Sequence, residues 1–74
     1  VGADTWVLDA WPPADENEPF PGHPILIQKN GIHILEVMNT GPLVKDNVNE
    51  FLFVLGQAKV KGAVQMIINP IAIR

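Results

Sequence analysis

The sequence contains no cysteine and no serine. Without cysteine the chain forms neither disulfide bonds nor thiolate metal sites. For the same reason, the sequence does not indicate whether its compartment is oxidising or reducing. Without either residue, the commonest covalent nucleophiles of hydrolases are missing, and only two threonines remain. The sequence therefore offers no strong candidate for catalysis through a covalent intermediate.

Long apolar runs are absent too. None approaches the roughly 18 to 20 residues that a membrane-spanning helix needs, and no signal peptide is visible, so a cytoplasmic location is the expectation. Basic residues are few, because five lysines and arginines stand against eight acids, and they form no stripe with interleaved aromatic residues. We therefore expect neither a nucleic acid nor a membrane as a partner.

The net charge of −3 is unevenly distributed along the chain. Residues 1–20 contain no base and carry a charge of −5, whereas residues 21–74 carry a charge of +2. Residues 10–22, "AWPPADENEPFPG", hold four prolines and three acids. This composition predicts a stiff surface loop, and long loops in compact domains are often functional.

The apolar content is high for the length of the chain. Of the 74 residues, 47% are hydrophobic and 18% are charged, which is typical of a folded protein. A chain of this size forms at most one domain and buries a smaller share of its surface than a larger chain. We therefore expect a homo-oligomer or a companion chain to cover the apolar runs. The strand-like start at Val1, without a methionine, predicts the interior of a longer polypeptide.

One short helix is predicted between two strands. Residues 1–9 can form a strand, and Pro24 suits the first position of a helix that Asn30 and Gly31 end. Residues 31–39, "GIHILEVMN", alternate in the manner of a strand.

The second half of the chain is predicted to add two more strands. Residues 40–49 read as a loop, with room for one helical turn. Residues 50–60 predict a central strand, because positions 51–55 are apolar on both faces. Residues 63–74 predict a last strand, which Pro70 confines to an edge or a bulge. The predicted fold class is mixed α/β, a strand-rich sheet with one short helix.

Two polar residues stand out against this pattern. His23 follows the proline-rich loop and precedes the helix, where an imidazole could bind a divalent metal, act as a base or simply lie exposed at the helix start. Glu36 shares a predicted strand face with Ile32 and Ile34, and a carboxylate on an apolar face is costly unless it is paired or binds a cation. Alternatively, the strand frays at Glu36 and its side chain reaches water.

These two residues do not complete a site by themselves. His33 is predicted to face away from Glu36, and catalytic zinc normally takes three protein ligands. Asp4 could add a carboxylate if residues 1–9 lie beside residues 31–37.

Several stretches together resemble the C-terminal part of the cyclase-family metal-dependent hydrolases, which include kynurenine formamidase and isatin hydrolase. They are "VGADT", "GHPILIQKNGIHILE", "EFLFVL" and "KVKGA" with the later "PIAI", and they cover nearly the whole chain. The resemblance implies that residues 1–74 are a single partial domain of a swivelling β/β/α-type fold that assembles as dimers or tetramers. It also implies hydrolysis of a small amide substrate by a water that zinc or manganese activates.

The same resemblance implies roles for the two polar residues. His23 would be a metal ligand or proton shuttle, and Glu36 a metal ligand or base, so both are the candidate catalytic and metal-binding residues. The family's motif His-x-Gly-Thr-His-x-Asp has no match in this chain, and "GAVQMIINP" stands where the family has a glycine-rich turn. The chain is therefore expected not to be catalytic alone.

Two other functions compete with this hypothesis. One is a non-enzymatic oligomerisation module derived from the same fold. The other is a small-ligand binding protein that uses Trp6, Trp11 and Phe20 as a lid.

The geometry of the predicted helix and strand gives a sharper expectation. If the fold follows that family, the turn at Asn30 and Gly31 reverses the chain, and His23 and Glu36 then lie at the same end of the helix and strand, on the side of the acidic loop. Their polar atoms should lie within reach of one ion or one bridging water.

Overall fold

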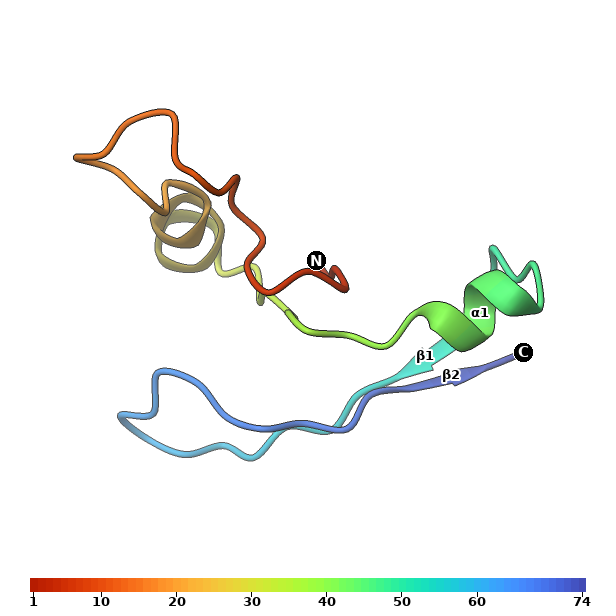
Figure 1. The fold of residues 1–74 in the computed structure, drawn as a ribbon. Coiled ribbons are helices and arrows are strands. Elements are labelled where there is room, and N and C mark those ends of the chain that lie inside the picture. The colour runs from red at the N-terminus through yellow and green to blue at the C-terminus, as the bar shows by residue number, and fades with distance from the viewer. The chain divides into compact units, whose positions relative to one another are not determined.

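The computed structural model describes residues 1–74 as two compact units, Val1–Gly41 and Pro42–Arg74. The elements in chain order are a π-helix η1 (Pro24–Lys29), a helix α1 (Gly41–Lys45) and the strands β1 (Leu52–Val54) and β2 (Ile71–Ile73) (Figure 1). This is the mixed helix and strand content that the sequence predicted. The strands, however, are fewer and shorter than predicted.

The predicted helix after the proline-rich loop is confirmed. Pro24 opens η1, where its missing N–H leaves no intrahelical bond unmade. Asn30 closes the helix, and its side-chain amide donates to the carbonyl of Ile25 at 2.6 Å. Gly31 follows with φ of 64°, the left-handed conformation that glycine adopts at low cost after a helix. The helix has the wider π form, which is rare and is found often at functional sites.

In the first unit, residues 1–5 lie parallel to residues 33–38. The Ala3 N–H donates to the Leu35 carbonyl at 3.0 Å, and the Leu35 N–H donates to the Val1 carbonyl at 2.9 Å. The contact amounts to one isolated parallel bridge, so the predicted strands at residues 1–9 and 31–39 are wrong as regular strands.

One reason is that Val37 turns the chain out of the extended conformation, with φ of 56°.

In the second unit, β1 and β2 form a two-stranded antiparallel sheet in which Phe53 pairs with Ala72. The predicted long strands at residues 50–60 and 63–74 are wrong in extent, because only three residues of each are strand. A strand that is apolar on both faces needs layers packed on both faces of its sheet, whereas the side chains of β1 remain between 43% and 63% exposed. The helix α1 is the single helical turn anticipated within residues 40–49.

The first unit positions the candidate site, and neither unit has a buried core. No side chain of the chain is fully buried. On β1 and β2, the large apolar side chains are between 43% and 63% exposed, namely Leu52, Phe53, Val54, Ile71 and Ile73. Neither helix has the length and apolar character needed to cross a bilayer.

Candidate functional site

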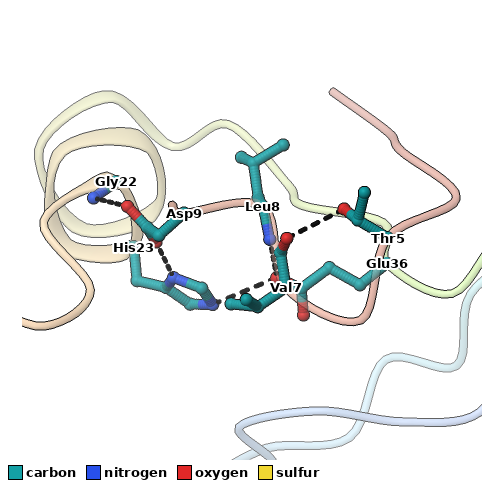
Figure 2. Close-up of polar contacts among 7 residues, drawn as sticks. All are labelled: Thr5, Val7, Leu8, Asp9, Gly22, His23 and Glu36. Atoms are coloured by element: carbon teal, nitrogen blue, oxygen red, sulfur yellow. Dashed lines mark hydrogen bonds and ion pairs between the residues drawn. The ribbon is translucent and has the colours of Figure 1, made fainter. Parts of the chain in front are cut away.

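Asp9, His23 and Glu36 meet in the first unit (Figure 2). They come from three segments: the chain before the proline-rich loop, the residue just before η1, and the segment beside residues 1–5. The Nδ1 atom of His23 lies 2.7 Å from Asp9 Oδ2, and its Nε2 atom lies 3.6 Å from Glu36 Oε1. The imidazole thus stands between two carboxylates, as the sequence predicted for His23 and Glu36 but not for Asp9.

Asp9 is the best-shielded side chain of the three, with 8% of it exposed. Its Oδ1 atom accepts a hydrogen bond from the Gly22 N–H at 2.6 Å, while its Oδ2 atom contacts His23. A side chain at position 22 would collide with this carboxylate, because a Cβ atom there would lie 2.6 Å from Asp9 Oδ1. Glycine at position 22 therefore allows the loop to close onto Asp9.

These contacts lower the pKa of Asp9. Partial desolvation of the carboxyl acts in the opposite direction and raises its pKa. The hydrogen bonds from His23 and from the Gly22 N–H, together with the charge interaction with His23, outweigh that effect. Asp9 is therefore ionised at neutral pH and acts only as a hydrogen-bond acceptor.

The orientation of His23 follows from the ionised state of Asp9. A carboxylate has no proton to give, so the hydrogen bond at 2.7 Å requires the proton to sit on Nδ1 of His23. In the neutral imidazole, Nε2 then carries a lone pair, and this lone pair lies on the side of Glu36. The 3.6 Å between Nε2 and Glu36 Oε1 is too long for a direct hydrogen bond.

Glu36 is held from the opposite side. Its Oε1 atom accepts a hydrogen bond from the Leu8 N–H at 2.8 Å, and 27% of its side chain is exposed. The next residue, Val37, has φ of 56°, a conformation that β-branched residues rarely adopt. Its N–H donates to the Thr5 carbonyl at 2.9 Å, which keeps this turn in place. Strained backbone of this kind gathers at functional sites.

Aromatic side chains extend the site along the loop. The ring of Phe20 meets His23 edge to face, with centroids 5.8 Å apart and planes at 68°. Trp11 stacks on Phe20 at 5.9 Å, and Trp6 meets Trp11 at 6.5 Å. Trp6 and Trp11 are 74% and 62% exposed. The three residues considered as a lid therefore form one continuous row that ends at His23.

The other polar candidates are elsewhere. Residues 1–5 do lie beside residues 33–38, but Asp4 accepts a hydrogen bond from the Thr40 hydroxyl at 2.5 Å and does not join the site. His33 is not part of the cluster around His23. Sequence reasoning missed Asp9, although it ends the strand-like run just before the loop that returns to His23.

Comparison with known proteins adds no relative. No family model matches the sequence, and no curated protein or solved structure matches it. Within the chain, no group of three or more histidine, cysteine, aspartate or glutamate side chains is placed to hold a metal ion. The site offers two donors in one place, His23 Nε2 and Glu36 Oε1.

Proposed function

We propose that this chain is the C-terminal segment of a cyclase-family metal-dependent amidohydrolase, to which it contributes His23 and Glu36 as metal ligands. One observation carries the proposal: Nε2 of His23, which carries a lone pair in the neutral imidazole with its proton on Nδ1, lies 3.6 Å from Oε1 of Glu36. A lone pair and a negatively charged oxygen repel each other at that distance, and a cation between them converts the repulsion into attraction.

The two donors fit zinc in type and in spacing. Zinc binds imidazole nitrogen and carboxylate oxygen at about 2.0 to 2.2 Å. Two donors 3.6 Å apart are close enough together to bind one such ion. Imidazole and carboxylate donors also suit other divalent metals, manganese among them. Such an ion, when bound, would supply Lewis-acid activation of a water for amide hydrolysis.

Two ligands alone hold a divalent ion weakly. A catalytic zinc site normally has three protein ligands, so the missing ones must come from outside these 74 residues. The proposal therefore requires either more of the same polypeptide or a companion chain. The isolated parallel bridge between residues 1–5 and 33–38 supports this, because further strands could extend its hydrogen bonding. The swivelling β/β/α fold is the architecture we propose for the complete protein.

Metal titration of the full chain tests the proposal. Calorimetry with zinc, and separately with manganese, should show one ion bound weakly per chain, because only two of the ligands are present. His23→Ala and Glu36→Gln should each weaken binding at least about tenfold, or about 1.4 kcal/mol. His33→Ala and Glu50→Gln are the matched controls and should change nothing. Equal losses for His23→Ala and His33→Ala would show non-specific binding and sink the proposal.

The second unit supports another function, and we infer that its apolar surface is an assembly surface. Side chains on both faces of β1 and β2 are about half exposed. At about 25 cal/mol per Å² of apolar surface, covering the exposed part of each such side chain would contribute about 1 to 2 kcal/mol of stabilising free energy. Together they amount to several kcal/mol, comparable to the whole stability of a small domain. A second copy or a companion chain covering β1 and β2 would recover this free energy.

A further inference from the structure

We propose that Asp9 is the positioning residue of the site: it fixes the tautomer and the ring orientation of His23, so that the Nε2 lone pair faces Glu36. The inference rests on the proposed function in one respect, namely that Nε2 is the atom that binds the cation. The selection of the tautomer itself involves only contacts within this chain.

The first step is the competition between two carboxylates for one imidazole proton. Asp9 Oδ2 lies 2.7 Å from Nδ1, the distance of a strong charge-assisted hydrogen bond. Glu36 Oε1 lies 3.6 Å from Nε2, beyond hydrogen-bond range. The proton therefore stays on Nδ1 next to Asp9. An exposed neutral histidine side chain in water prefers its proton on Nε2, so Asp9 reverses the default and keeps the side toward Glu36 open.

The second step is that Asp9 is itself held in place. Its other oxygen accepts the Gly22 N–H at 2.6 Å, and its side chain is only 8% exposed. The carboxylate thus cannot rotate away without leaving a backbone donor unsatisfied. On the ring, the edge-to-face contact with Phe20 adds a second restraint. Histidine ligands of metals are oriented in general by a carboxylate or carbonyl on their other nitrogen.

The tautomer can be read directly. In the metal-free, nitrogen-15-labelled full chain, long-range proton–nitrogen correlation spectra distinguish a protonated Nδ1 from a protonated Nε2. His23 should carry its proton on Nδ1. Asp9→Ala should move it to Nε2. Asp9→Asn keeps one acceptor oxygen, for which the Gly22 N–H and the His23 Nδ1–H compete, so it should move the proton less completely than Asp9→Ala does. Glu16→Ala removes the same charge from the adjoining proline-rich loop and should leave the spectrum of His23 unchanged.

Zinc titration of the same variants gives the second readout. Asp9→Ala should weaken zinc binding by about 10- to 100-fold, and Asp9→Asn by less. A wild-type His23 that carries its proton on Nε2, or that shows the averaged signals of a mobile ring, would overturn the inference. Equal effects of Ala and Asn on both readouts would reduce Asp9 to a packing role and also overturn it. If the tautomer behaves as expected but zinc does not bind, the proposed function fails while the positioning role of Asp9 stands.

Discussion

Truncation of one side chain on β1 tests whether the apolar surface of the second unit is an assembly surface. Phe53 is 43% exposed, and its ring contacts Phe51 at 6.4 Å between centroids. A phenylalanine that buries about 200 Å² when covered leaves roughly 85 Å² exposed here, worth about 2 kcal/mol at 25 cal/mol per Å². In a symmetric dimer both copies contribute, so Phe53→Ala should weaken association by about 4 kcal/mol, close to a thousandfold.

Sedimentation equilibrium of the wild-type chain and of Phe53→Ala at micromolar concentration measures this difference. Lys61→Ala, on the polar stretch beyond β1, is the control and should associate as the wild type does. A companion chain in place of a second copy would appear in the intact mass of the purified sample as a second species. The reasoning is refuted if the wild-type chain is a well-folded monomer, or if Phe53→Ala associates as tightly as the wild type.

Three further predictions concern the first unit. Gly31→Ala should lower the free energy of unfolding by about 1 kcal/mol in denaturant titrations, because φ of 64° favours glycine. Val37→Asn should raise it by about 1 kcal/mol, since asparagine tolerates φ of 56° better than a β-branched residue, and should leave zinc affinity unchanged. Because the folded pKa of Asp9 is lowered, its contacts stabilise the unit fully above the unfolded pKa of about 3.9 and lose their effect as the pH falls through the lower folded value. The Gly22 amide resonance should report that transition below pH 3.9, and a midpoint above the ordinary pKa would contradict the assigned contacts.

The parts of the fold that the sequence predicted are those with local causes. Pro24 at the helix start and Asn30 with Gly31 at its end act within one or two residues of the helix boundary. These local signals determine where the helix begins and ends independently of contacts with the rest of the chain. The same holds for the helical turn of α1, which begins at Gly41 just before a proline.

The strands could not be predicted in the same way, because a strand exists only through its neighbours. Residues 50–60 have the composition of a central strand, but β1 finds one partner and its other edge has none. Residues 31–39 alternate correctly, yet only Leu35 forms a bridge, and the positive φ of Val37 interrupts the extended backbone. Alternating apolar and polar residues make a segment compatible with a β-sheet. They do not provide the neighbouring strand with which it must pair.

The part of the site that could be predicted is the pair of residues on either side of the turn after the helix. That turn brings His23 and Glu36 together once the chain reverses after the helix, and the lengths of the two segments allow their polar atoms to meet. Asp9 is 14 residues from His23 across a proline-rich loop, and nothing in the loop's composition fixes where its ends meet. The close approach of Asp9 to His23 depends on Gly22. The structure shows why, because a Cβ atom at position 22 would collide with the Asp9 carboxylate.

The most direct test of the account follows the two histidine side chains during a zinc titration of the full chain. Nitrogen-15 spectra resolve each imidazole nitrogen, so the atom that binds zinc can be identified. Zinc should shift the Nε2 signal of His23 and leave the signals of His33 unchanged. Replacing Glu36 by Gln should weaken the zinc affinity at His23 at least about tenfold. Equal shifts at both histidines, or an unaltered titration in Glu36→Gln, would contradict the claim that His23 and Glu36 hold one metal ion together.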